Sequence, residues 1–216
     1  MKTTVAKRLD SYALTRIEVL VIVAVLTVMA VVVLIGIPQA KRKSQRIDCA
    51  ENLKRIGLNF RLWSTTQSDY YPMAVSTNKS GTLEVSGDVW RNFLALSNEI
   101  GTTKHLVCPA DKERVAATSW STLRNANISY FIGLEALEME PQSLLSGDSN
   151  LEVDGKPAGS GILNLRTNSV VGWTEARHNR NGNVVLGDGS VQQLTSKRLR
   201  GLLDTTGAAT NRLAIP

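Results

Sequence analysis

Histidine and cysteine are scarce in this chain, which has two of each: His105, His178, Cys49 and Cys108. Two cysteines are too few for a disulfide scaffold or a zinc site, although they could form one bridge outside the cytoplasm. Neither histidine has a carboxylate or thiol at the sequence spacing of a metal motif. No Ser-His-Asp nucleophile motif is recognisable either. We therefore expect no enzymatic activity and no resident cofactor.

A basic folded region is also lacking, despite a net charge of +6. Residues 39–61 carry seven basic and two acidic side chains, whereas residues 62–216 carry 14 and 15. A nucleic-acid-binding domain would concentrate positive charge on its folded part. We therefore expect no nucleic-acid partner, and we expect the basic residues to face the headgroups of membrane lipids.

A long apolar run stands near the N-terminus, with no charge in the 19 residues from Val19 to Ile37. As a helix it would be about 28 Å long, which matches the core of a bilayer, and it has no polar face. A cleaved secretory signal usually has about 7–15 apolar residues, and GIPQAKRK is a poor cut site. A plain signal anchor and a prepilin segment are the other two interpretations.

Glu18 lies at the head of this apolar run. A carboxylate entering a membrane is costly unless it is paired or lies at the headgroup level. A plain anchor gains nothing from such a residue, so Glu18 favours the prepilin interpretation.

Residues 13–20, ALTRIEVL, resemble the type IV prepilin signature of a small residue, an apolar residue, Thr, Leu, a variable residue and Glu before a long apolar helix. The family usually has Gly before the cut, Phe after it and Leu where this chain has Arg16. The resemblance implies cleavage by a prepilin peptidase between Ala13 and Leu14, and N-methylation of Leu14. It also implies that Glu18 neutralises the terminal amine of a neighbouring subunit.

The topology implied by the resemblance is a single pass through the inner membrane, with the N-terminus cytoplasmic and the head periplasmic or extracellular. The distribution of basic residues predicts the opposite, because the side richer in Lys and Arg usually stays in the cytoplasm. The leader has three basic residues, and the first ten residues after the proline that follows the run have four.

A second amphipathic segment follows Pro38, which is expected to kink or interrupt the helix. Apolar residues recur at spacings of 4, 3, 4 and 3, as on one stripe of a helix: Cys49, Leu53, Ile56, Phe60 and Trp63. We expect a basic leader at 1–13, a transmembrane and stalk helix at 14–66, and a globular head at 67–216.

The head is predicted to be α+β, with a small antiparallel sheet packed on the long helix, an architecture that the resemblance makes pilin-like. Asp88 is expected to cap a helix over 89–99 that Gly101 ends. The predicted strands are 106–108, 128–132, 170–173, and a hairpin of 183–187 with 190–194 around Asp188-Gly189. Residues 197–203 are predicted to be a helix and residues 141–161 a loop.

Several longer blocks are similar to a planctomycete–verrucomicrobial paralogous family of type II secretion pseudopilin-like proteins: DCAENLKRIGLNFRLW, DVWRNFLALSNEIGTTKHLVCPADKER, NANISYFIGLEA with PQSLLSGDSN, and HNRNGNVVLGDGSVQ. The similarity implies a structural subunit, a pseudopilin or minor pilin, of a type II secretion or type IV pilus-like filament. Its partners would be other pilin subunits, prepilin peptidase and inner-membrane lipids. The alternative is a membrane-anchored binding or adhesion protein that does not polymerise.

Two candidate sites remain. Cys49 and Cys108 form either one disulfide or two buried free thiols; a bridge would close a loop of about 60 residues and add roughly 3–4 kcal/mol. Asp148, Asp154 and Asp188 are candidate calcium ligands, although their spacing matches no EF-hand loop.

Overall fold

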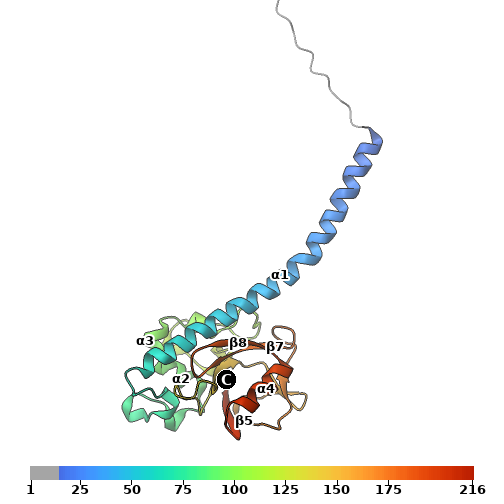
Figure 1. Ribbon diagram of the computed structural model, residues 1–216. Coiled ribbons are helices and arrows are strands. Elements are labelled where there is room, and N and C mark those ends of the chain that lie inside the picture. The colour runs from blue at the N-terminus through green and yellow to red at the C-terminus, as the bar shows by residue number, and fades with distance from the viewer. Residues whose placement is uncertain (1–14) are drawn as a thin grey trace, which may run out of the picture. The chain divides into compact units, whose positions relative to one another are not determined.

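The computed structural model describes residues 15–216, which form two compact units, one ending at Lys41 and the other comprising Arg42–Pro216 (Figure 1). Helix α1, Arg16–Ser64, contributes to both units. The expected leader 1–13 and the cleavage residues Ala13 and Leu14 lie outside the described residues.

The first unit is the apolar part of α1. The large apolar side chains described between Ile17 and Ile37 are all exposed. They lie on every side of the helix rather than along one stripe. This segment is long and apolar enough to cross a membrane, by length and composition. The helix is not interrupted at Pro38, where a break was one of the expected outcomes.

The second unit begins with the amphipathic part of α1, and here the predicted stripe is confirmed. Cys49, Leu53, Ile56 and Phe60 are fully buried, and Trp63 is 6% exposed. Between them, Glu51, Lys54 and Arg55 are exposed. Positions three and four apart share one face of a helix, so the apolar spacing alone determines which side of α1 faces the core.

A six-stranded sheet forms the centre of the second unit, with the strand order β5-β9-β1-β2-β7-β8 and every neighbouring pair antiparallel. Its strands in chain order are β1 Tyr130–Gly133, β2 Leu144–Asp148, β5 Gly161–Arg166, β7 Asn181–Leu186, β8 Val191–Thr195 and β9 Thr210–Ile215. A smaller antiparallel sheet has the order β4-β3-β6. It consists of β3 Leu151–Val153, β4 Lys156–Pro157 and β6 Val171–Trp173.

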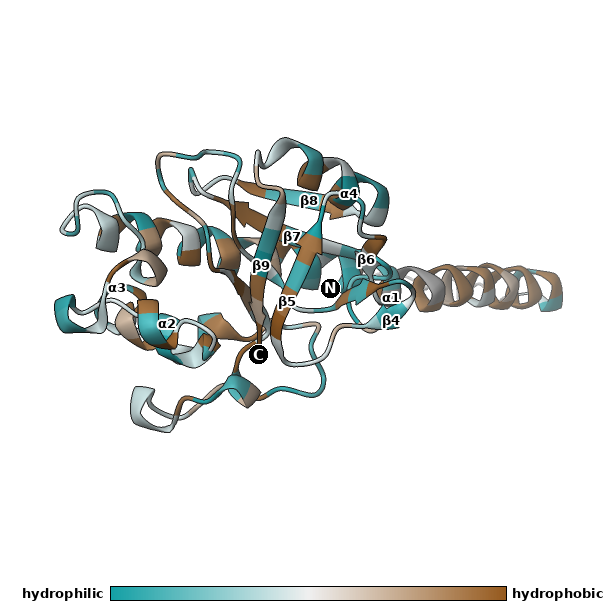
Figure 2. Cartoon of the chain, turned by 90° about the horizontal axis from the view of Figure 1, so that it is seen from below, coloured by the Kyte–Doolittle hydropathy of each residue, from teal (hydrophilic) through white to brown (hydrophobic). Residues whose placement is uncertain are grey.

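Both faces of the large sheet are covered, as the apolar residues on its central strands show (Figure 2). Alternate residues of a strand point to opposite faces, so each strand serves two cores. The core shared with the α1 stripe contains Tyr130, Ile132, Leu145, Val185 and Ala214. The other core contains Phe131, Leu144, Val184, Leu186, Leu213 and Ile215.

The remaining helices are short. They are α2 Val89–Ala95, α3 Ser97–Ile100 and α4 Ser196–Thr205. The described chain also has six 3₁₀ turns, three between α1 and α2 and three between α3 and β1. They are η1 Pro72–Ala74, η2 Thr77–Lys79, η3 Leu83–Val85, η4 Thr103–Leu106, η5 Trp120–Thr122 and η6 Asn125–Asn127. Helix α4 packs Leu199, Leu202 and Leu203 into the second core.

The α+β class, the long helix and the antiparallel sheet are confirmed, as are the hairpin β7–β8, strand β6, the helix near residue 200 and most of β1. The helix predicted over 89–99 is divided at Leu96, although Gly101 ends α3 with a φ of 72° as expected. Asp88 precedes α2 without a side-chain capping bond.

Two predictions about the head are wrong. Residues 141–161 are not a loop, because they contain the buried strand β2, the partly buried β3 and the exposed β4. Residues 106–108 are not a strand, since Leu106 is the last residue of the 3₁₀ turn η4 and residues 107 and 108 lie in an irregular segment. Strands β5 and β9 were not predicted.

Gly57 and Gly201 offer a matched test of packing between α1 and the sheet. A Cβ at Gly57 would lie 2.6 Å from Val185 Cγ2, whereas a Cβ at Gly201 in α4 would meet nothing within 4 Å. We expect Gly57→Ala to lower the free energy of unfolding by about 1–3 kcal/mol through overpacking. Gly201→Ala should raise it by about 0.5–1 kcal/mol through lower backbone entropy in the unfolded chain. Denaturant titration of the full chain in detergent measures both, and equal stabilisation by the two substitutions would contradict the close approach.

Candidate functional site

Four segments of the second unit bring two cysteines, an aspartate and a histidine together. Cys49 comes from α1, Cys108 from the irregular segment after η4, Asp148 from the end of β2, and His178 from the connection between β6 and β7. One sulfur, nitrogen or oxygen atom of each lies within 4.8 Å of the corresponding atoms of the others. Cys49, Cys108, Asp148 and the His178 side chain are all 0% exposed.

The contacts inside this cluster are short and polar. Cys49 Sγ donates to Asp148 Oδ1 at 3.0 Å and lies 3.3 Å from the hydroxyl of Tyr130. His178 Nε2 lies 3.3 Å from Cys108 Sγ and 3.6 Å from Asp148 Oδ2. The prediction that no histidine has a thiol or carboxylate partner therefore holds for sequence spacing only; in space His178 has both.

The carboxylate of Asp148 is held from its far side by Asn183. The backbone N–H and the side-chain Nδ2 of Asn183 donate to Asp148 Oδ2 at 2.7 and 2.9 Å. Asn183 lies on β7, which pairs with β2, so the sheet itself fixes this arrangement. Asp148 Oδ1 is consequently directed to Cys49 and the other members of the cluster.

The two thiols differ in acidity. The hydrogen bond from Cys49 and then that from His178 lower the pKa of the Cys108 thiol to about 6. Burial raises the pKa of the Cys49 thiol, and its contacts with Cys108 and Asp148 add to the shift. Burial alone would lower the pKa of His178, but its hydrogen bond to Cys108 and the charge of Asp148 outweigh that effect and raise it. Cys108 is thus the thiol that most readily becomes a thiolate.

A left-handed turn directs His178 into the cluster. His178, Asn179 and Arg180 have φ values of 51°, 52° and 58°, a conformation that costs energy for residues other than glycine. The side chain of Asn181 stabilises this turn by donating to the carbonyl oxygens of His178 and Asn179, at 3.2 and 2.8 Å.

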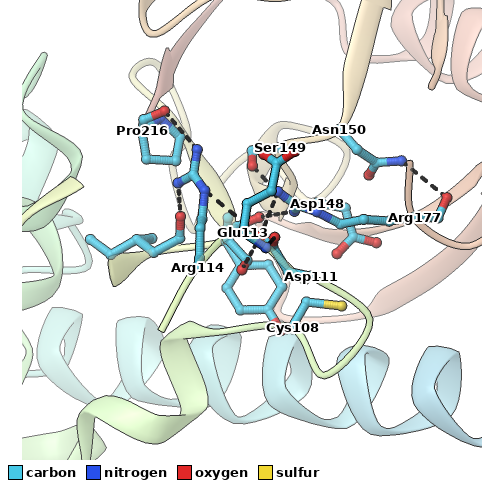
Figure 3. A network of polar contacts seen from close by, with 12 residues as sticks. Cys108, Asp111, Glu113, Arg114, Asp148, Ser149, Asn150, Arg177 and Pro216 are labelled. Atoms are coloured by element: carbon cyan, nitrogen blue, oxygen red, sulfur yellow. Dashed lines mark hydrogen bonds and ion pairs between the residues drawn. The ribbon is translucent and has the colours of Figure 1, made fainter. Parts of the chain in front are cut away.

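A buried ion pair lies beside the cluster and joins the segments that carry its members (Figure 3). Arg177 Nη2 and Asp111 Oδ2 are 2.6 Å apart, with side-chain exposures of 9% and 2%. Arg177 Nη1 also donates to the carbonyl oxygen of Ser129 at 2.9 Å and to Ser149 Oγ at 3.3 Å. Ser129 Oγ donates to Asp111 Oδ2 at 2.8 Å.

Three residues of this outer network are close sequence neighbours of cluster residues. Asp111 follows Cys108 in a turn closed by the bond from Asp111 N to Cys108 O at 2.9 Å. Arg177 precedes His178, and Ser149 follows Asp148. Arg114 extends the network by donating to the carbonyl oxygen of Pro216 at 3.0 Å (Figure 3). The outer network therefore fixes the backbone positions from which three of the four cluster side chains project.

The three calcium candidates do not share a site in the described part of the chain. Asp154 lies in the turn between β3 and β4, with a φ of 51°, and Asp188 lies in the β7–β8 turn, where its Oδ1 accepts from Ser190 N at 2.8 Å. Asp148 is surrounded by sulfur and imidazole nitrogen, which are not calcium ligands. The role of Asp188 in the hairpin turn, in contrast, is as expected.

Cys49 and Cys108 are free thiols in the structure, and both belong to this one cluster. A disulfide between them stays a prediction. A bound metal ion is the alternative to a disulfide, because two neighbouring thiols, an imidazole and a carboxylate can coordinate one ion together.

Glu18 forms a separate arrangement in the first unit. Glu18 Oε2 accepts hydrogen bonds from the backbone N–H and the hydroxyl of Thr15, at 2.7 and 2.9 Å. Thr15 Oγ1 in turn accepts from Glu18 N at 3.3 Å. This reciprocal pair is a capping box at the start of α1, and the spacing Thr-x-x-Glu in the sequence already signals it. A plain membrane anchor therefore does gain something from Glu18, contrary to the expectation from sequence.

No match is found when the chain is compared with known protein families, with curated proteins and with solved structures.

The Asp111–Arg177 pair allows a test of the support around the cluster. Arg177→Met should lower the free energy of unfolding by about 2–4 kcal/mol, because it removes the nearer of the two cations that face the buried Asp111 carboxylate and leaves only Arg114, 3.7 Å away. The matched control is Arg180→Met in the same loop, whose pair with Glu175 spans 3.9 Å between side chains that are 70% and 73% exposed. Its effect should stay below about 1 kcal/mol. Denaturant titration of both variants checks this, and similar small effects would contradict a supporting role for Arg177.

Proposed function

We propose that this chain is a structural subunit, a pseudopilin or minor pilin, of a type II secretion or type IV pilus-like filament. In this proposal it is a single-pass protein of the inner membrane with a cytoplasmic N-terminus and a periplasmic or extracellular head. Prepilin peptidase cleaves it before Leu14 and methylates the new terminus. Its work is assembly rather than bond chemistry.

The observation that carries the proposal is the exposure of the apolar part of α1 on every side. From Ile17 to Ile37 none of the described large side chains is covered by the rest of the chain. A helix that is apolar all round is stable only when lipid or other protein surrounds it. A filament subunit meets both conditions in turn, because its helix leaves the bilayer to pack among the helices of other subunits.

The start of α1 supports the same proposal. In the resemblance to prepilins, Glu18 pairs with the terminal amine of a neighbouring subunit. Its capping bonds to Thr15 leave Glu18 Oε1 without a partner in the described chain, so one carboxylate oxygen stays available to a second donor. A cap within the chain and an ion pair between chains are therefore compatible.

The capping box also favours a second candidate, a membrane-anchored binding or adhesion protein that does not polymerise. In that case Glu18 acts only within its own chain, where a cap is worth about 1 kcal/mol to the helix. The two candidates differ in what they require of residue 18: assembly requires its charge, whereas the cap requires only a side chain that can accept the hydrogen bond of Thr15.

The N-terminus of the chain purified from its native membranes tests the processing step. Intact-mass and peptide mass spectrometry should find a chain that begins at Leu14 with a methylated amine. An intact Met1, or cleavage after residue 37, would rule out the filament proposal.

Glu18→Gln and Thr15→Ala separate charge from capping. Gln preserves a capping box but removes the charge, whereas Thr15→Ala removes the cap and leaves the charge. In a co-capture assay with two differently tagged copies expressed in the same membranes, Glu18→Gln should lose at least about ten-fold in yield, as expected when an ion pair worth more than ~1.4 kcal/mol is lost in a membrane. Thr15→Ala should assemble nearly as wild type. Normal assembly of Glu18→Gln would mean that the pairing role given to Glu18 is wrong, whereas no co-capture of two wild-type copies would favour the non-polymerising anchor.

A further inference from the structure

We propose that Cys49, Cys108, Asp148 and His178 form a site for one Zn²⁺ ion, which holds α1 to three segments of the head. The inference rests on the second unit alone and is independent of whether the chain polymerises. No sequence motif signals this site, because its four residues are spread from position 49 to position 178.

The spacing of the four donor atoms matches a tetrahedral ion. Zn–S bonds of about 2.3 Å and Zn–N or Zn–O bonds of about 2.0 Å place neighbouring ligand atoms about 3.3–3.8 Å apart. The distances between proposed ligand atoms are 3.0 Å for Cys49 Sγ and Asp148 Oδ1 and 3.3 Å for Cys108 Sγ and His178 Nε2. His178 Nε2 lies 3.6 Å from the other carboxylate oxygen, Oδ2. None of the four atoms is more than 4.8 Å from another, so shifts of side chains by about 1 Å complete the coordination.

The chemistry of the donors selects zinc among common ions. Ca²⁺ and Mg²⁺ take oxygen ligands, and only one of the four residues supplies oxygen. Two thiolates with an imidazole suit Zn²⁺, which accepts a carboxylate as its fourth ligand. The site has no open position for a substrate, since all four side chains are buried, and a closed four-ligand site is typical of structural rather than catalytic zinc.

An outer shell of polar groups orients the other ligands, whereas the buried Nδ1 of His178 has no hydrogen-bond partner in the described chain. Asn183 fixes Asp148 Oδ2 with two hydrogen bonds and leaves Oδ1 to face the ion. Tyr130, whose hydroxyl lies 3.3 Å from Cys49 Sγ, is placed to donate to a thiolate at that position. The pair Asp111–Arg177 fixes the backbone next to Cys108 and His178. Such outer partners typically control metal affinity by about 10–100-fold.

A divalent cation would also interact directly with the buried negative charge of Asp148. Asp148 is fully buried, and the only cationic group within 4.0 Å of it in the described chain is the His178 ring. A buried carboxylate beside two ionisable thiols is unfavourable unless a cation compensates it. Zn²⁺ would take the place of the two thiol protons, which leaves the net charge of the cluster unchanged but puts a divalent cation in direct contact with the carboxylate.

The direct test is the metal content of the full chain, purified in detergent with a tag that contains no histidine. After incubation with equimolar Zn²⁺ and gel filtration, mass spectrometry of the metals should find one zinc per chain, and alkylation should find two thiols after the metal is removed. X-ray absorption should give two sulfur and two nitrogen or oxygen neighbours. Replacement by Co²⁺ should give the thiolate charge-transfer and intense visible bands of tetrahedral cobalt.

Matched variants assign the ligands. His178→Gln and Cys108→Ser should each weaken zinc binding by more than about 100-fold in competition with a chromogenic chelator, because even outer-shell changes cost about 10–100-fold. Asn183→Ala, which keeps the backbone donor to Asp148, should weaken it by about 10-fold or more. His105→Gln is the control, since His105 bonds to Asn52 outside the cluster, and it should leave affinity and stoichiometry unchanged.

Three results would overturn the proposal, and the first two are read on the wild-type chain, so they do not depend on whether a variant folds. One is a folded chain with two free thiols that binds no zinc at equimolar concentration. Another is a mass two hydrogens lower than expected, with no alkylatable thiol, which would establish the disulfide. A third is unchanged zinc affinity in a folded His178→Gln variant.

Discussion

The packing of the second part of α1 on one face of the large sheet is the interaction on which the rest of the structure depends. Its buried stripe, from Cys49 to Trp63, supplies a large share of the first core, and the strands β1, β2, β7 and β9 supply the opposing residues. Because both faces of the sheet are buried, the strands cannot slip by one residue without exchanging their two cores. The register of the sheet and the position of α1 therefore determine each other.

The polar cluster is a consequence of this packing. Cys49 is the first fully buried residue of the stripe, so the helix has to place its thiol at the edge of the core, beside the end of β2. The loops that carry Cys108 and His178 reach the same place because Asp111 and Arg177 join them. Polar groups at this depth need internal partners, and Asn183 and Tyr130 supply them to Asp148 and Cys49. His178 Nδ1 and Asn183 Oδ1 have no such partner in the described chain.

Local patterns predicted the elements that depend on local interactions. The spacing of Cys49, Leu53 and Ile56 is enough to identify the buried face of α1, and Asp188-Gly189 is enough to place the hairpin β7–β8. Strand β2 escaped prediction because its stability comes from pairing with β1 and β7, which allows glycine and aspartate inside it. Strands β3 and β4 escaped although they pair with each other across Asp154-Gly155, which is a local turn signal.

The cluster could not be predicted in the same way. Its members are separated by 30 or more residues, and no spacing rule connects positions that meet only through the fold. The capping box of Thr15 and Glu18 is different, because its signal is local. The spacing Thr-x-x-Glu in the sequence is enough to predict it.

Strand β9 has a consequence for how the chain folds during synthesis. It is the last strand in the sequence, yet it lies inside the large sheet, between β5 and β1. The ribosome must therefore release residues 210–215 before the sheet can close, and until then β1 and β5 present unpaired edges that can bind other chains. The apolar helix precedes all of these strands in the chain, and the edges of β1 and β5 stay unpaired while residues 167–209 are made.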